Sequence, residues 1–137
     1  MKEVKRGKKA FDAYYSNIFG SRWLSLSEAL LAPSSPIPYS ENLKKPYYMD
    51  EASIAVGKVL PPLDNGIILD MCAAPGGKTL VLSNILRDGV RLQANELSGI
   101  RRNRLIAVIE EHLDDNVKEK ISITGYDAAK MCKISIS

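Results

Sequence analysis

The chain has 137 residues, of which 45% are hydrophobic, and a formal net charge of +3. This length allows one domain at most, and the composition fits a soluble globular protein without repeats or low-complexity tracts. Residues 1–9 hold five basic residues against one acidic residue, so the positive charge belongs to a tail and not to the whole surface. Such a tail is either solvated or attracted to phosphate backbones, and the composition leaves both interpretations open.

Cys72 and Cys132 are the only cysteines, and neither belongs to a Cys-x-x-Cys pair or accompanies a histidine cluster. We therefore predict no metal site and no disulfide framework. No apolar stretch approaches the roughly 18 residues that suggest a membrane span. The basic N-terminus also lacks the apolar segment of a secretory signal. The sequence predicts a cytoplasmic protein without a membrane partner.

Residues 1–46 are predicted to form a helical N-terminal segment with a basic tail and a proline-rich connector. Residues 8–19 have apolar side chains at helical spacing, and a glycine follows them as a typical stop. Ser25 and Glu28 are spaced as in a capping box, which predicts a second short helix. We expect three side chains of this region to pack inward: Trp23, Leu26 and Leu30.

The connector over residues 33–46 contains four prolines and several serines, which disfavour regular structure. We expect it to wrap over the following domain, because Ile37 and Tyr39 would otherwise be exposed. Residues 47–137 are predicted to form the N-terminal half of a cofactor-binding domain. Asp50 is expected to cap its first helix.

Three short apolar segments in this second part predict strands that alternate with helices, which indicates an α/β fold. Residues 67–69 form a continuous apolar run closed by Asp70, as expected of a parallel strand buried on both faces. Residues 91–95 and 121–124 predict the second and third strands, with a helix over residues 98–113 between them. The apolar stripe of that helix is predicted to contain Ile100, Leu105, Val108, Ile109 and Leu113.

The same helix also contains three arginines and one histidine, and the arginines lie mainly off this stripe. The arginines are compatible with a charged outer face and equally with a contact to cofactor or RNA. The histidine, near the end of the helix, is expected to be exposed to solvent and to have no role. These residues are Arg101, Arg102, Arg104 and His112.

The turn between the first strand and the next helix is rich in small residues, which let backbone approach a cofactor closely. It reads Asp70-Met71-Cys72-Ala73-Ala74-Pro75-Gly76-Gly77-Lys78-Thr79. A P-loop requires glycine six positions before its lysine, where this chain has Cys72. A dinucleotide fingerprint requires three spaced glycines, of which only Gly77 is present. Both nucleotide motifs are therefore partial matches.

The whole turn resembles the cofactor loop of the Sun/RsmF family of RNA cytosine-C5 methyltransferases. The resemblance extends roughly over residues 10–130 and includes Tyr48-Met49-Asp50-Glu51-Ala52-Ser53. It implies a partial Rossmann-like class I methyltransferase fold, with the first three parallel strands in the order 3-2-1 and their helices. It also implies S-adenosylmethionine as the cofactor and RNA, in the first place ribosomal RNA, as the substrate.

Two acidic residues at predicted strand ends are candidates for cofactor contacts. Glu96 follows the glycine-rich turn by about twenty residues, a spacing at which a carboxylate accepts ribose hydroxyls. Its alternative role is a charge at a helix N-terminus. The resemblance implies that Asp127 accepts from the adenine amino group, the alternative being an exposed turn residue. The predicted cofactor-binding set is Cys72, Ala73, Ala74, Pro75, Gly76, Gly77, Lys78, Glu96 and Asp127.

Members of the resembled family use a cysteine thiolate that attacks cytosine C6 and a second cysteine that helps to release the product. The resemblance assigns both to segments after the fourth and fifth strands, beyond Ser137, and neither cysteine of this chain matches them. We therefore expect no catalytic residue here, inactivity of the chain alone, and a missing C-terminal half or a complementing chain as partner. The first strand then lies at a sheet edge, with helices over one face.

Two classes of function follow from these patterns. The first is a cofactor-binding fragment of a ribosomal RNA cytosine-C5 methyltransferase. The alternative is a non-catalytic module that binds S-adenosylmethionine or RNA. A nicotinamide-dependent oxidoreductase is a distant third.

Overall fold

The computed structural model describes residues 7–33 and 35–133. The chain divides into two compact units, residues 1–34 and residues 35–137.

The first unit consists of two helices, α1 (Lys8–Phe19) and α2 (Arg22–Leu31), joined at Gly20. The ring of Trp23 stacks on that of Tyr15, with centroids 5.0 Å apart and planes 19° apart. Trp23 is the one buried side chain that the described parts of the two helices contain. The helix predicted over residues 8–19 is confirmed.

The second helix differs from the prediction at its start and on one face. It begins at Arg22, so Ser25 lies inside the helix, where its hydroxyl donates to the carbonyl oxygen of Arg22 at 3.1 Å instead of capping. Leu30, expected to pack inward, is 69% exposed. Trp23 ends up against α1 because the chain reverses at Gly20, whose φ of 57° is open to glycine.

The second unit begins with an antiparallel ribbon of β1 (Ile37–Tyr39) and β2 (Tyr47–Met49). The prediction of an irregular connector was therefore wrong over residues 37–39. A two-stranded ribbon has a free outer edge, where the N–H that Pro38 lacks is not needed. Tyr39 and Met49 are buried against Val81, which lies in the helix over residues 77–82, so the segment does pack over the following domain as expected.

A three-stranded parallel sheet forms the centre of this unit, in the order β3-β4-β5. The strands are β3 (Gly66–Asp70), β4 (Val90–Asn95) and β5 (Ile121–Thr124). The helices are α3 (Glu51–Lys58), α4 (Gly77–Leu82), α5 (Gly99–His112) and α6 (Asp115–Lys118), with 3-10 turns η1 (Ser83–Ile85) and η2 (Ala128–Lys133). This α/β arrangement, with the second strand in the middle, confirms the predicted fold class and strand order.

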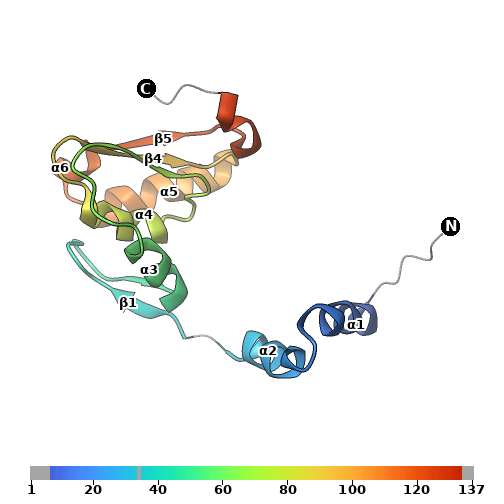
Figure 1. Ribbon diagram of the computed structural model, residues 1–137. Helices are drawn as coiled ribbons and strands as arrows, with labels where there is room; N and C mark the ends of the chain where they lie inside the picture. Colours follow the sequence, from blue (N-terminus) through green and yellow to red (C-terminus); the bar gives the residue numbers. More distant parts are fainter. Residues whose placement is uncertain (1–6, 34, 134–137) are drawn as a thin grey trace. The chain divides into compact units, whose positions relative to one another are not determined.

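The two faces of the sheet have different neighbours. Figure 1 shows α4 and α5 on one side of the strands, and the side chains that face them form the core. Leu92, Ala94, Leu80 and Leu105 are all fully buried there. On the opposite face, Ile67 is 41% exposed, contrary to the expectation of a strand buried on both sides.

Two predictions about α5 were wrong. Ile100, placed in the apolar stripe, is 87% exposed, because α5 begins only one residue before it and its first turn extends past the core. His112, expected at the surface, is 5% exposed. Its Nδ1 lies 3.0 Å from the carbonyl oxygen of Val108. The ring of Tyr47, in the β-ribbon that was not predicted, contacts the imidazole edge-on with ring centroids 5.2 Å apart.

Among the helices of the described residues, none is long and apolar enough to cross a lipid bilayer.

Candidate functional site: the carboxyl ends of the parallel strands

The loop after β3 is closed and largely buried. Ala73 and Ala74 are 1% and 4% exposed, and Gly76 and Gly77 are also buried. The Ala74–Pro75 peptide bond is cis. Below the loop, Thr79 donates a hydrogen bond of 3.0 Å to the carboxylate of Asp70, so Asp70 connects the end of β3 to the start of α4 across the turn.

Gly76 is a position where only glycine fits. Its φ is 126°, which L side chains rarely adopt, and a Cβ there would lie 2.8 Å from Cγ1 of Val108 in α5. The loop therefore rests directly on α5, and its backbone comes closer to that helix than any side chain would allow.

Asn95, the last residue of β4, connects the ends of all three strands. Its Nδ2 donates to the carbonyl oxygens of Met71 at 3.1 Å and Tyr126 at 2.9 Å. Its Oδ1 accepts from the Thr124 hydroxyl at 2.9 Å and from the Tyr126 N–H at 2.8 Å. The side chain is 1% exposed, and its own carbonyl accepts from the N–H of Ala73. Sequence reasoning missed this role, although a buried amide at a strand end has to find partners.

Glu96 is held in a fixed orientation at the end of β4. The residue is 5% exposed, and its Oε1 accepts a 2.9 Å hydrogen bond from the N–H of Ser98. Its Oε2 lies 3.5 Å from Nη2 of Arg101. The contact with Ser98 agrees with the alternative role at the helix start, and the two roles are compatible because a carboxylate has several acceptor positions.

Asp127 follows β5 at the same edge of the sheet. Its Oδ1 accepts from the N–H of Ala129 at 3.1 Å, and Lys130 lies 3.5 Å from its Oδ2. The Asn95 side chain contacts both Tyr126, beside Asp127, and Met71 in the loop. The fold therefore brings the predicted set together at the carboxyl ends of the strands. Two members of the loop, Cys72 and Pro75, are exposed.

A cavity of about 270 Å³ lies between the loop and β2. It is lined by Tyr48, Asp50, Ser53, Pro75 and Lys78, among others. The Tyr48 to Ser53 motif noted in the sequence therefore lies beside the loop after β3, and both line the same cavity. Within the described residues, no group of three or more histidine, cysteine, aspartate or glutamate side chains could hold a metal ion.

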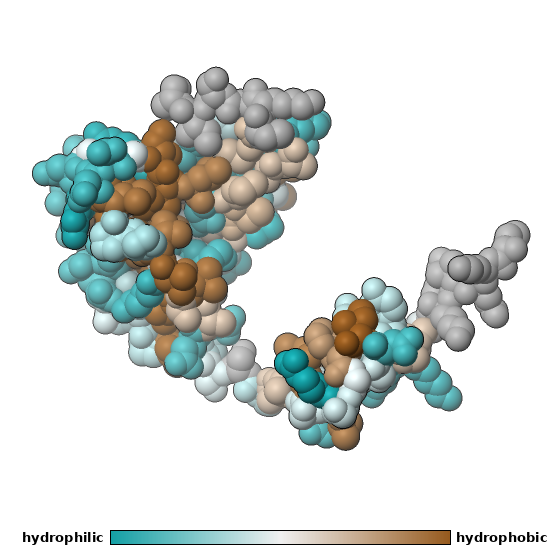
Figure 2. Space-filling model, viewed as in Figure 1, coloured by the Kyte–Doolittle hydropathy of each residue, from teal (hydrophilic) through white to brown (hydrophobic). Residues whose placement is uncertain are grey.

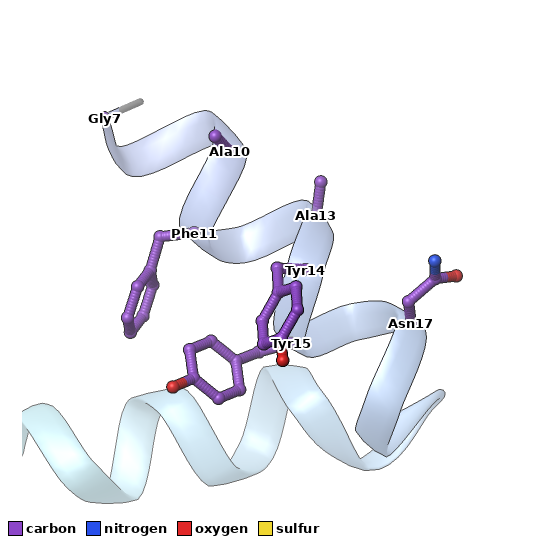
Figure 3. Close-up of a pocket in the computed structure, with 7 residues that line it drawn as sticks. All are labelled: Gly7, Ala10, Phe11, Ala13, Tyr14, Tyr15 and Asn17. Carbon is purple, nitrogen blue, oxygen red and sulfur yellow. The ribbon is translucent and has the colours of Figure 1, made fainter. Parts of the chain in front are cut away.

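The first unit has a hollow of about 600 Å³ around α1. Figure 3 shows Phe11, Tyr14 and Tyr15 pointing toward the neighbouring helix, whereas Ala10, Ala13 and Asn17 point away from it. Because these side chains do not converge and none is a charged group, we do not regard this hollow as a reaction site.

Comparison with known proteins identifies the family. The family model described as "16S rRNA methyltransferase RsmB/F" matches residues 57–136. The matched range contains the loop after β3, Asn95, Glu96 and Asp127, and S-adenosylmethionine is the cofactor of this methyltransferase family.

Relatives act on different RNAs according to their names. The bovine (Bos taurus) 5-cytosine rRNA methyltransferase NSUN4 is 39% identical over 61% of this chain and 22% of its own length. The tRNA (cytosine(72)-C(5))-methyltransferase of Pyrococcus horikoshii is 28% identical over 81% of this chain and 29% of its own length. The chain therefore spans between a fifth and a third of these relatives.

Solved structures agree with the sequence matches. NSun6 from Pyrococcus horikoshii, crystallised with SFG, superposes with a TM-score of 0.58 at 28% identity, over 77% of this chain and 26% of that chain. The family match covers more than half of the 137 residues, and the superposed fold is the same. The resemblance drawn from the loop is thus confirmed, and the chain belongs to the RsmB/F family of 16S rRNA methyltransferases.

Proposed function

We propose that this chain is the S-adenosylmethionine-binding part of an RNA cytosine-C5 methyltransferase that acts on ribosomal RNA. One observation carries the proposal: the small-residue loop, Glu96 and Asp127 lie together at the carboxyl ends of the strands and are joined through Asn95. Ligands of open α/β sheets bind at these carboxyl ends.

Each group of the site has a distinct proposed role. The backbone of the loop, from Cys72 to Lys78, contacts the methionine end of the cofactor. Glu96 accepts hydrogen bonds from the ribose hydroxyls, and its fixed orientation supports this because no rearrangement is needed on binding. Asp127 accepts from the adenine amino group. When bound, S-adenosylmethionine supplies an electrophilic methyl group.

The chemistry on cytosine requires a nucleophile that we assign to another segment. Cys72 is exposed within the cofactor loop, in a position unlike that of the family's nucleophile. A complementing C-terminal segment, in the same or another chain, would supply the cysteine that attacks cytosine C6. The chain by itself would then bind the cofactor without transferring its methyl group.

Two surface features support such a complementing segment. In the described residues β3 pairs with β4 on one side only, so its other edge offers free backbone groups. Figure 2 shows hydrophobic surface over the unit that carries this sheet. Exposed apolar residues of this unit include Val56, Val59, Ile67 and Met71. Exposed apolar surface of this kind is typical of an interface.

The family description names 16S rRNA, whereas relatives are named for either rRNA or tRNA. We favour ribosomal RNA on the family description. The cytoplasmic location stays a prediction.

Calorimetric titration of the purified chain with S-adenosylmethionine tests the cofactor site. We expect binding to the wild type, and Glu96→Gln and Asp127→Asn should each weaken it by about tenfold, since each removes a charged hydrogen-bond acceptor. Asp115→Asn is the matched control, because Asp115 is an exposed carboxylate on α6 and should leave the affinity unchanged. A wild-type chain that is folded but binds no S-adenosylmethionine would contradict the proposal, and preferential binding of a nicotinamide cofactor would favour the oxidoreductase.

Transfer of a labelled methyl group to ribosomal RNA separates the enzyme from the module. The chain should be inactive alone and active when a C-terminal segment from a relative is added. If cofactor binds but no methyl group is transferred in either case, the non-catalytic module is the better description.

A further inference from the structure

Arg101, which the sequence left without a role, contacts two separate parts of the proposed cofactor site. Its Nη2 donates a 2.9 Å hydrogen bond to the carbonyl oxygen of Ala74 in the loop after β3. The same nitrogen lies 3.5 Å from Oε2 of Glu96 at the end of β4. One guanidinium therefore joins the loop and the carboxylate, which are 22 positions apart in the sequence.

The burial of Glu96 gives this contact its importance. The carboxylate side chain is 6% exposed, and Arg101 is its one ion-pair partner in the part of the chain that the structure describes. A charge held away from water needs a compensating partner, and loss of that partner is costly. The Arg101 side chain is itself 59% exposed, so it can be truncated without opening the core.

The next residue, Arg102, lies beside the end of the neighbouring strand β5. Nη1 of Arg102 donates to the carbonyl oxygen of Glu96 at 2.8 Å. A Cβ on Gly125 would lie 2.4 Å from this nitrogen, so glycine leaves the space that the guanidinium fills beside the end of β5. The first turn of α5 thus contacts the segments after all three strands, with Arg101 on the loop side.

We propose that Arg101 is a positioning residue for the cofactor: it fixes the Glu96 carboxylate relative to the loop at Ala74, and so sets the spacing between the ribose contact and the methionine contact. This inference rests on the proposed function. Arg101 acts through Glu96 and the loop backbone, and its removal loosens both while the fold persists.

The test uses the whole chain and calorimetric titration with S-adenosylhomocysteine, which binds without reacting. Arg101→Ala should weaken binding by about tenfold, since it removes two charge-assisted contacts. Arg101→Lys keeps the charge and should recover part of that loss. Arg104→Ala is the matched control, because Arg104 is an exposed arginine of the same helix with no hydrogen bond or ion pair among the described residues. Circular dichroism should give the same spectrum for all of these variants.

A double-mutant cycle separates positioning from a general structural effect. In the Glu96→Gln background, Arg101→Ala should lower the affinity for S-adenosylhomocysteine by less than about threefold, because the side chain at position 96 has already lost its charge. Full additivity of the two substitutions, or an Arg101→Ala affinity within twofold of the wild type, would overturn the positioning role and leave the proposed function intact. Absence of binding to the folded wild type would instead overturn the proposed function, and this role with it.

Discussion

The two units of the chain differ in what holds their apolar residues. In residues 7–33, α1 and α2 stack aromatic rings on one another but bury only Trp23, and Leu30 and Leu31 are 69% and 81% exposed. In residues 35–133, three clusters of buried side chains connect the ribbon, the sheet and α5. Within the described residues, the helices of the first unit bury one side chain, whereas the second unit buries apolar residues of its ribbon, sheet and helices in these clusters.

This difference shows that a helical pattern predicts where a helix forms, not what it packs against. A pair of short helices derives little stability from local interactions alone. Contacts between residues distant in sequence stabilise the second unit, so substitutions of equal size should have unequal effects in the two units.

The largest contrast is expected for leucine truncation. Leu105 is 0% exposed in the core beneath the sheet, so Leu105→Ala should lower the free energy of unfolding by about 3 kcal/mol. Leu31→Ala, at 81% exposure, should change it by less than about 0.5 kcal/mol. Urea denaturation followed by circular dichroism measures both. Equal costs for the two leucines would show that the first unit is buried in a way that the described contacts do not include.

A buried polar group should give the next largest effect. Asn95→Ala removes four hydrogen bonds and leaves their partners unsatisfied, which should cost about 2–3 kcal/mol. The counterpart in the first unit is Ser27→Ala, which removes one exposed hydrogen bond to Leu24 and should cost less than about 0.5 kcal/mol. The same denaturation assay applies, and a neutral Asn95→Ala would refute its role in joining the strand ends.

Replacing a helical glycine by alanine compares two opposing effects, the gain in helix propensity and the steric cost of an added Cβ. In an exposed helix, Gly→Ala gains up to about 1 kcal/mol. At Gly57 in α3, a Cβ would lie 2.6 Å from Cγ1 of Val81, so Gly57→Ala should instead destabilise by about 1–2 kcal/mol. Gly99 is the control, since the nearest atom to its Cβ would be 3.9 Å away. Stabilisation by Gly57→Ala would mean that α3 and α4 are not in close contact.

The effect that is smallest at neutral pH concerns Tyr39, because it develops only at high pH. Burial, and secondarily the charge of Glu41, raise the pKa of Tyr39 from 10.0 to about 12. The folded state therefore favours the protonated phenol, and this contribution to stability is complete below pH 10 and is lost as the pH rises toward 12. Tyrosinate absorbance should show one late-titrating group in the wild type, and Tyr39→Phe should remove it. A titration curve that Tyr39→Phe leaves unchanged would contradict this assignment.

Much of the fold followed from the sequence because its signals are local. The continuous apolar run before Asp70 and the alternating residues of 121–124 predict strands wherever they lie. The small residues from Cys72 to Gly77 are needed because the backbone must close tightly against α5, and this made the cofactor loop recognisable from the sequence. The positions of Glu96 and Asp127 at strand ends followed from the order of the elements.

Other features depended on contacts that no local pattern records. The β-ribbon forms because Tyr39 and Met49 pack against Val81. Its Tyr47 in turn covers His112, which the sequence predicted to be at the surface. Asn95 and Arg101 obtain their roles from the segments that the sheet register and α5 bring beside them. The sequence alone thus determined the three parallel strands, the helices that alternate with them and the loop, since these depend on neighbouring residues. Only the tertiary structure decided which polar groups meet, because hydrogen bonds between distant segments require the whole sheet to be assembled.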